Sequence, residues 1–415
     1  MRRWKLSIGL TFALAMFAAT TSMTAPHAAA QTETILHSFG SPRLDGQRPT
    51  PGLAVDASGN VYGTTFFGGA YGYGMLFELT PAVGGGYAEK VIHSFNFNHT
   101  DGIYPAAGVI LDAAGNLYGT ASQGGANGYG AVFEFSPHAG GSWAGKSLYS
   151  FRALPDGENP YCGLTFDAAG NLYGTTAYGG IHGANGGTVF KLTPSAGGPW
   201  TKKTLYSFTY GGTDGYYSLA GVIFDASGNI YGTTTNGGLY RDGIAFELTP
   251  ASTGEWPETI LHNFGNGTDG QNPAGPLIFD GSGNLYGGAL NGGANTLGMV
   301  FELSPVAGGG WNENVVYTFS GATDGNDPGT GGLIFDGAGN LYGTTGGGGP
   351  STGGTLFKLT PAGGGTWTLS NLWGFGASGD GNGAQGVTVD ASGNFYGTTV
   401  VGGAHNLGTV FEVTP

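Results

Sequence analysis

Aspartate is the residue whose spacing most directly indicates chemistry in this chain. Fourteen of the sixteen aspartates fall in two slots that recur about every 55 residues. The first slot opens the motif seen in "DASGNVYG", and the second is an Asp-Gly pair formed by Asp45, Asp101, Asp156, Asp214, Asp269, Asp324 and Asp380. Seven carboxylates that converge on one axis, together with backbone carbonyls, could hold calcium. The alternative is that each Asp caps a turn whose Gly needs a positive φ.

A second set of candidate site residues consists of tyrosines in particular loops of the first four repeats. The set comprises Tyr71, Tyr73, Tyr104, Tyr129, Tyr161, Tyr178, Tyr216, Tyr217 and Tyr240. The matching loops of the last three repeats contain Asn, Gly, Thr and Ala instead, as in "NGGANTLG". A tyrosine ring offers an apolar face and a hydroxyl, which suits a sugar ring or a peptide partner. The alternative is that these rings pack on neighbouring loops and order a glycine-rich backbone.

Histidine gives no clear catalytic pattern. His37, His93 and His262 share one strand position with Tyr149, Tyr206, Tyr317 and Trp373, which indicates aromatic packing. His182 and His405 lie in loops, where a solvated side chain is the simplest interpretation. Nucleophile elbows, paired-cysteine motifs and phosphate-binding loops are absent from the sequence. We assign no catalytic residue and expect a protein that is not an enzyme.

The aspartate motif defines seven repeats, and four short strands fit each repeat. The motif begins at Asp56, Asp112, Asp167, Asp225, Asp280, Asp336 and Asp390. In the first repeat we expect strands near 52–56, 60–65, 75–79 and 90–95. Four short strands at this period are typical of a β-propeller, an all-β ring of four-stranded antiparallel blades. The Gly after each motif Tyr, such as Gly63, should sit where bulk would collide with the next blade, or at a bulge.

The two ends of the chain predict how the ring closes. The chain ends on the third strand of the seventh repeat, whereas residues 34–39 read as a fourth strand with no strands before it. We therefore expect residues 34–39 to complete the last blade, which would leave the ring without a free edge. Residues 31–415 would then be a single seven-bladed propeller domain.

Composition excludes several classes of protein. The 415 residues include 87 Gly, 25 Phe and 21 Tyr, and only 10% are charged. Disorder is excluded because the glycines recur at a fixed period among many aromatic residues. The formal net charge of −14 argues against nucleic-acid binding, which needs positive charge to neutralise phosphates.

The N-terminus reads as a secretory signal. Residues 1–30 combine Arg2, Arg3 and Lys5 with an apolar stretch and the small residues Ala28, Ala29 and Ala30. We expect cleavage near Ala30, export to the periplasm, the cell surface or the medium, and a mature chain with no membrane span. Cys162 is the only cysteine, which excludes an intrachain disulfide, and we expect it to be a small buried residue in a monomer.

The repeats resemble the GloVer tandem repeat of secreted and surface-anchored bacterial proteins. The resemblance rests on "GNLYGTT" (170–176 and 339–345), the Gly-Gly that follows, and "GTVFKLTP" (187–194). More distantly, "GLAVDASGNVYGTT" is similar to NHL-type propeller repeats. The resemblance implies a propeller outside the cytoplasm and implies no activity.

These features together favour a secreted, non-catalytic binding module. Its ligand would be a carbohydrate, another cell-surface polymer or a surface protein, held on the tyrosine-rich loops, with calcium as a candidate cofactor. Two alternatives remain open at this stage: a lyase- or lactonase-type propeller enzyme with a metal at the mouth of its channel, and a purely structural extracellular protein.

Overall fold

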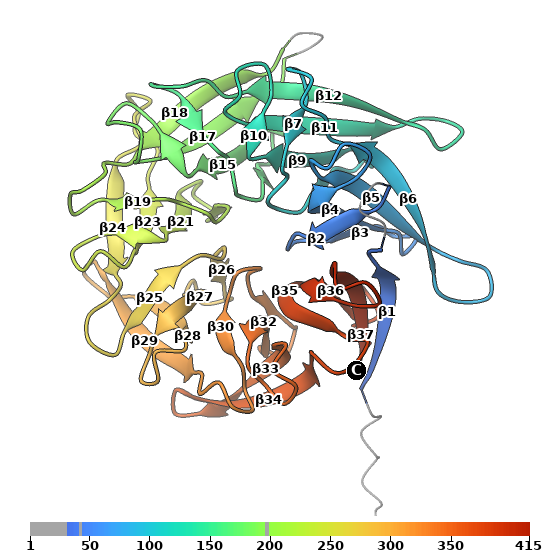
Figure 1. Ribbon diagram of the computed structural model, residues 1–415. Coiled ribbons are helices and arrows are strands. Elements are labelled where there is room, and N and C mark those ends of the chain that lie inside the picture. Colours follow the sequence, from blue (N-terminus) through green and yellow to red (C-terminus); the bar gives the residue numbers. More distant parts are fainter. Residues whose placement is uncertain (1–30, 41–43, 196–198) are drawn as a thin grey trace, which may run out of the picture. The chain divides into compact units, whose positions relative to one another are not determined.

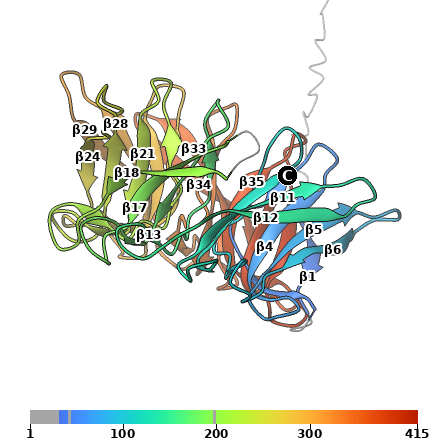
Figure 2. The ribbon, with the colours of Figure 1, turned by 90° about the horizontal axis from the view of Figure 1, so that it is seen from above.

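The computed structural model describes residues 31–40, 44–195 and 199–415, and residues 31–415 form one compact unit. The predicted signal peptide, residues 1–30, lies outside the described residues. Every regular element in the described part of the chain is a β-strand. Seven sheets surround a central axis as the blades of a propeller (Figure 1), which confirms the predicted fold class. The view turned by 90° shows loops that project beyond the strands on both faces of the ring (Figure 2).

Each blade has four antiparallel strands, which we call a to d from the channel outward. The first blade contains β3 (Ala54–Val55), β4 (Val61–Gly68), β5 (Met75–Pro81) and β6 (Tyr87–Ser94). The second contains β8 (Ile110–Leu111), β9 (Leu117–Ala121), β11 (Ala131–Pro137) and β12 (Trp143–Ser150). The third contains β14 (Thr165–Phe166), β15 (Leu172–Thr176), β17 (Thr188–Thr193) and β18 (Thr201–Ser207). The fourth blade contains β20 (Ile223–Phe224), β21 (Ile230–Thr234), β23 (Ile244–Leu248) and β24 (Glu258–Asn263). The fifth contains β26 (Ile278–Phe279), β27 (Leu285–Gly292), β28 (Met299–Pro305) and β29 (Trp311–Thr318). The sixth contains β31 (Ile334–Phe335), β32 (Leu341–Gly347), β33 (Thr355–Gly363) and β34 (Thr366–Gly374).

The seventh blade closes the ring with the N-terminal strand. It contains β35 (Gly381–Val389), β36 (Phe395–Gly402), β37 (Thr409–Thr414) and β1 (Thr32–Ser38). Strand β1 pairs antiparallel with β37, from Thr32 opposite Thr414 to Ser38 opposite Thr409. Figure 1 shows β1 beside β37 in this sheet, close to the C-terminus. The predicted closure by residues 34–39 is confirmed.

In six blades a short additional strand follows strand d. It pairs antiparallel with strand b of the next blade, or with a separate short strand that follows that strand b in the sequence. The additional strands are β2 (Gly46–Pro49), β7 (Gly102–Ile103), β13 (Gly157–Glu158), β19 (Gly215–Tyr216), β25 (Gly270–Pro273) and β30 (Asn326–Pro328), with β10 (Gln123–Gly124), β16 (Tyr178–Gly179) and β22 (Asn236–Gly237) as partners of β7, β13 and β19. These strands were not predicted from the sequence. They fix the connection from each blade to the next.

The hydrophobic core is divided into seven clusters, and each cluster lies between two adjacent blades. In the cluster at the ring closure, Leu36 and Phe39 pack against Phe77 of the first blade and Val410 of the seventh. The rings of Phe39 and Phe77 meet edge to face with centroids 5.4 Å apart. Equivalent phenylalanine pairs join the other blades at 4.6 to 5.3 Å. Packing between neighbours therefore holds the ring together.

The turn between strands a and b explains the repeated motif. Asp56 accepts hydrogen bonds from the backbone N–H groups of Ser58 and Asn60, and also from the Asn60 side chain and the Tyr62 hydroxyl. The same backbone and Asn side-chain bonds occur at the other six motif aspartates. Because this bonding occupies the carboxylate, the motif Asp is a structural residue. Cys162 is buried as expected, and burial raises the pKa of its thiol.

The recurrent Gly after the motif Tyr is needed for a different contact from the one predicted. A Cβ placed on Gly63 would lie 2.6 Å from Phe77 Cζ and 2.7 Å from Leu53 Cδ2. Both side chains belong to the same blade as Gly63, so the predicted collision with the next blade is wrong. Strands a and c of one blade close over this glycine, and the same geometry recurs at Gly232 against Phe246 and Val222.

We expect Gly63→Ala to lower the free energy of unfolding by about 1–3 kcal/mol, the usual cost of overpacking a well-filled core. Gly337→Ala is the matched control, because nothing lies within 4 Å of a Cβ there and the first repeat already has Ala57 at that position. The measurement is chemical denaturation of both variants. Equal midpoints for Gly63→Ala and the parent protein would contradict the assignment.

Candidate binding face

The connections between blades and the loops within them meet on one face of the ring. The Tyr104 N–H, in the connection into the second blade, donates to the carbonyl of Tyr73, in the b–c loop of the first, at 2.9 Å. Asn272 N–H donates in the same way to the Asp242 carbonyl at 2.7 Å. The d–a and b–c connections therefore share a face, and we call it the loop face.

Seven equivalent positions on the loop face have a left-handed backbone, and we call them the variable ring. Each lies three residues after the Asp of the Asp-Gly slot: Arg48, Tyr104, Asn159, Tyr217, Asn272, Asp327 and Gly383. The φ values of the six non-glycine members lie between 53° and 62°. Such values are uncommon for bulky side chains and persist where the surroundings enforce them. Here the N–H of every member donates to a b–c loop carbonyl of the preceding blade. The backbone is thus fixed while the side chain differs from blade to blade.

Tyr104 forms the centre of an aromatic cluster between the first two blades. Its ring stacks on Phe66 at 5.3 Å with an interplanar angle of 18°. Phe67 and Tyr73 meet the same ring edge to face at 5.5 and 5.6 Å. A second cluster joins Tyr178 to Tyr217 at 5.3 Å, and burial followed by contact with Tyr178 raises the pKa of Tyr217 to about 12.

The nine predicted tyrosines therefore divide into two groups. Tyr73, Tyr104, Tyr161, Tyr178, Tyr216 and Tyr217 are half-buried, and all but Tyr161 make ring contacts with neighbouring loop residues. Tyr71, Tyr129 and Tyr240 are 56%, 36% and 41% exposed. The first group orders the loops, as the alternative interpretation held. The second group presents aromatic surface to solvent on three b–c loops.

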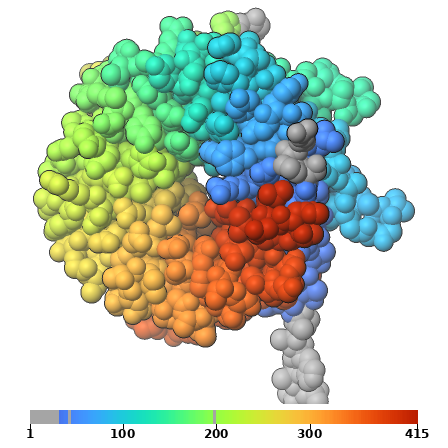
Figure 3. Space-filling view, viewed as in Figure 1, coloured from blue at the N-terminus to red at the C-terminus, as the bar shows by residue number. Residues whose placement is uncertain are grey.

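The central channel forms a cavity of about 620 Å³ at the axis of the ring. Figure 3 shows the hollow at the centre of the molecule. Strand a residues and the segments before them line it with Pro, Gly, Ala, Val and Leu, together with Phe66, Tyr161 and Gln385. Arg48 is the one charged side chain among its lining residues, which include neither histidine nor a carboxylate. The channel offers apolar contact and hydrogen bonds, and its described lining lacks the groups that an acid–base pair or a metal site would need.

The Asp-Gly carboxylates do not converge on the channel axis. The structure places each one between two blades, near the outer strand d. Asp101 bonds to the imidazole of His93 at 3.0 Å, and Asp324 accepts the hydroxyl hydrogen bond of Tyr317 at 3.0 Å. The carboxylate turns outward because backbone N–H groups just after strand d bind it, as Gly40 N–H binds Asp45 at 2.7 Å. The expected axial ring of seven calcium ligands is therefore corrected to seven separate positions.

Glycine occupies the second position of the Asp-Gly pair for a different reason from the positive φ considered above. Of the seven such glycines, only Gly325 has a positive φ. A Cβ on Gly46 would instead collide with Thr65 of strand b, and one on Gly157 with Thr176. Close approach of the connection to strand b therefore selects glycine.

A glutamate slot escaped the sequence analysis. Glu33, Glu89, Glu258 and Glu313 each lie four residues before the aromatic position of strand d. Burial is the largest cause that raises the pKa of these four glutamates. The pKa is raised to about 7 for Glu89 and Glu313, and to about 8 for Glu33 and Glu258. The spacing Glu-x-x-x-His, present at 33–37, 89–93 and 258–262, was the available signal. It was missed because each glutamate meets an aspartate from the neighbouring blade, which is 44 residues earlier in the chain for Glu89, Glu258 and Glu313 and at the opposite end of the chain for Glu33.

The histidines of strand d make both an aromatic contact and a polar contact. His37, His93 and His262 meet Phe39, Phe95 and Phe264 edge to face, which confirms aromatic packing. Each imidazole also reaches the Asp of the following connection. His182 and His405 are exposed in their loops.

Fold and repeat together define the class of protein as a seven-bladed propeller built from tandem repeats. The chain belongs to the Gloeobacter/Verrucomicrobia repeat family, whose model matches residues 20–238 and 219–415. No curated protein sequence matches the chain. In the described residues no helix is long and apolar enough to cross a membrane.

Several solved structures match the chain at low identity. An ancestral GH74 enzyme has a TM-score of 0.55 and 12% identity, with coverage of 89% of this chain and 48% of that one. A gluconolactonase from Xanthomonas campestris has a TM-score of 0.44 and 12% identity over 92% of this chain and 89% of its own. A protein of unknown function from Dyadobacter fermentans has a TM-score of 0.43 and 12% identity, over 82% of this chain and 98% of its own. These similarities concern the fold alone.

Proposed function

We propose that the protein is exported and acts as a non-catalytic binding module that recognises a carbohydrate chain of a cell surface through its loop face. The observation that carries the proposal is the asymmetry of that face. Tyr71, Tyr129 and Tyr240 are exposed on the b–c loops of the first, second and fourth blades, whereas the matching loops of the last three blades carry no Tyr, Phe or Trp.

The chemistry of this surface supports a neutral, ring-shaped ligand. Tyrosine rings pack against the apolar faces of sugars, and their hydroxyl groups exchange hydrogen bonds with sugar hydroxyls. Aromatic residues on loops held by a rigid scaffold are a common basis for binding. The net charge of −14 repels anionic polymers. The variable ring and the apolar channel beside it supply further contacts that differ from blade to blade.

A glycan array tests the proposal directly. Residues 31–415 would be screened with calcium present and again with EDTA. We expect selective binding of neutral glycans that is unchanged by EDTA, since the Asp-Gly carboxylates do not converge. A blank array in both conditions would overturn the carbohydrate assignment.

We expect the triple substitution of Tyr71, Tyr129 and Tyr240 by Ala to weaken binding at least 100-fold. Exposed aromatic anchors each contribute about 1–2 kcal/mol to such contacts, and these three side chains add little to the core. Val83→Ala with Val306→Ala is the control, because these residues are exposed on the c–d loops of the opposite face. Titration of the best glycan measures the affinity, and thermal denaturation confirms the fold. Full affinity in the triple variant would place the binding site elsewhere.

A further inference from the structure

The seven interfaces between blades share one small polar site near their outer edge. Each site combines the aromatic position of strand d, the Asp of the following connection, and the residue four positions before the aromatic in the next strand d. The third position holds Glu89, Gly145, Lys202, Glu258, Glu313, Leu369 and Glu33 around the ring. Only two interfaces combine His, Asp and Glu, and they lie four blades apart.

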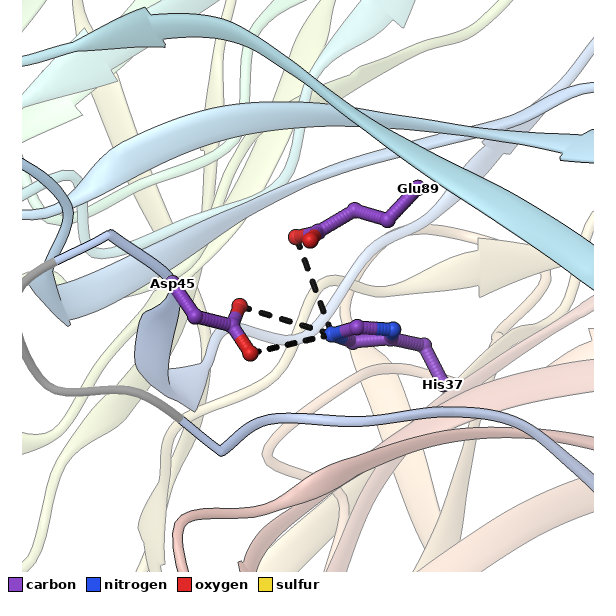
Figure 4. Close-up of side chains that lie close together, drawn as sticks. All are labelled: His37, Asp45 and Glu89. Carbon is purple, nitrogen blue, oxygen red and sulfur yellow. Dashed lines mark hydrogen bonds and ion pairs between the residues drawn. The ribbon is translucent and has the colours of Figure 1, made fainter.

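The first of these sites joins the closing strand to the first blade. His37 comes from β1, Asp45 from the connection and Glu89 from β6. His37 Nε2 lies 3.3 Å from Asp45 Oδ2 and 3.7 Å from Glu89 Oε1, and Figure 4 shows the imidazole directed between the two carboxylates. The three ligand atoms lie within 4.8 Å of one another.

The second site repeats this arrangement between the fourth and fifth blades. His262 Nε2 lies 2.8 Å from Asp269 Oδ2, and Glu313 completes the set within the same 4.8 Å limit. In both sites a backbone N–H holds the aspartate, from Gly46 to Asp45 Oδ1 and from Gly270 to Asp269 Oδ1, at 2.6 Å each. Such bonds orient a carboxylate before a ligand binds.

Each site contains a glutamate oxygen to which no donor is hydrogen-bonded. Glu89 Oε1 and Glu313 Oε1 are buried from solvent and accept no hydrogen bond in the described structure. A buried carboxylate oxygen without a partner is costly, so its environment calls for a cation or a proton. In the interface between the second and third blades the protein provides the cation itself, because the Lys202 ammonium binds Asp156 in the same place.

We propose that His37–Asp45–Glu89 and His262–Asp269–Glu313 are two equivalent sites for a divalent transition-metal ion of the Zn²⁺ type. One imidazole nitrogen and two carboxylates form a ligand set that zinc accepts, with water at the open position. Ligands at about 2.1 Å in a tetrahedral site lie about 3.4 Å apart, close to the separations in the first site. Calcium prefers oxygen ligands, and the imidazole argues against it.

The positions of the sites indicate a structural role. In the first site a bound ion would join β1 to β6, and so would secure the strand that closes the ring. In the second it would join β24 to β29. An ion that binds only the folded chain stabilises it in proportion to the logarithm of its concentration. The partly exposed imidazoles, 20% for His37 and 19% for His262, leave each site open to solvent.

The test uses untagged residues 31–415, stripped with EDTA and dialysed against Zn²⁺ alone. We expect about two zinc ions per chain by elemental analysis, and a higher melting temperature with zinc than with EDTA. Glu89→Gln and Glu313→Gln should each remove one ion, and together both ions and the stabilisation.

His93→Ala is the matched control. His93 occupies the same strand position and contacts Asp101 at 3.0 Å, but its interface has Gly145 in place of glutamate. We expect this variant to keep both ions. No bound zinc in the parent protein, or two ions retained in the double glutamine variant, would overturn the proposal.

Discussion

A chain that begins at Leu44, and therefore lacks β1, is expected to lose the monomeric folded state. Removal of β1 leaves β37 as an exposed edge, because the residues from Thr32 to Ser38 that pair with β37 are then absent. It also empties the positions of Leu36 and Phe39, which are 6% and 0% exposed. Loss of one buried phenylalanine costs about 3–5 kcal/mol, and whole domains are stable by only about 5–15 kcal/mol. An open sheet edge adds a route to aggregation.

Size-exclusion chromatography with light scattering, followed by thermal denaturation, would measure this effect. The control is a chain that begins at Gln31, which keeps β1 and should elute as a folded monomer. A synthetic peptide of residues 31–43, added during refolding, should restore part of the monomer by pairing with β37. A folded, monomeric chain from Leu44 onward, with an unchanged melting temperature, would show that ring closure contributes little.

The repeat made the architecture predictable from sequence. Turn residues such as Asp56 and Gly59 act locally, so their pattern located the hairpin between strands a and b. The unmatched strand at each end of the chain then left one arrangement without a free edge. These inferences needed only contacts within a blade and the order of its strands.

The features that escaped prediction all depend on contacts between blades. Glu89 meets His37 and Asp45 only because two outer strands of neighbouring blades lie side by side. The left-handed backbone at Arg48 and Tyr104 opposes the local preference of these residues. It arises because their N–H groups reach the preceding b–c loop, which no local pattern encodes.

The division of the tyrosines has the same origin. Tyr104, in a d–a connection, and Tyr129, in a b–c loop, have the same side chain. Tyr104 is half-buried because the loop of the preceding blade brings Phe66 and Tyr73 against it, whereas Tyr129 reaches solvent. Sequence composition located the aromatic sector, but only the packing between blades separates the rings that order loops from those that face a ligand.

Acid pairs at two further interfaces predict that the protein is less stable at alkaline pH. Glu258 lies beside Asp214, and Glu33 lies beside Asp380. Burial, and then the neighbouring aspartate, raise the pKa of each glutamate from 4.5 to about 8. Between these two values the folded chain holds a proton that the unfolded chain releases. The contribution to stability is therefore complete below about pH 4.5 and is lost as the pH rises through 8.

We expect the free energy of unfolding to fall between pH 5 and pH 9 by on the order of 2 kcal/mol from the two pairs together, after allowance for solvent screening. Chemical denaturation across this range, with EDTA present to remove bound metal, measures the slope. Glu258→Gln keeps a neutral group beside Asp214 and the Tyr206 hydroxyl, so it should remove about half of the fall that these two pairs cause. Glu255→Gln, at an exposed position of the preceding loop, should leave it unchanged. If the parent protein and Glu258→Gln lose stability equally as the pH rises, these glutamates do not carry protons in the folded ring.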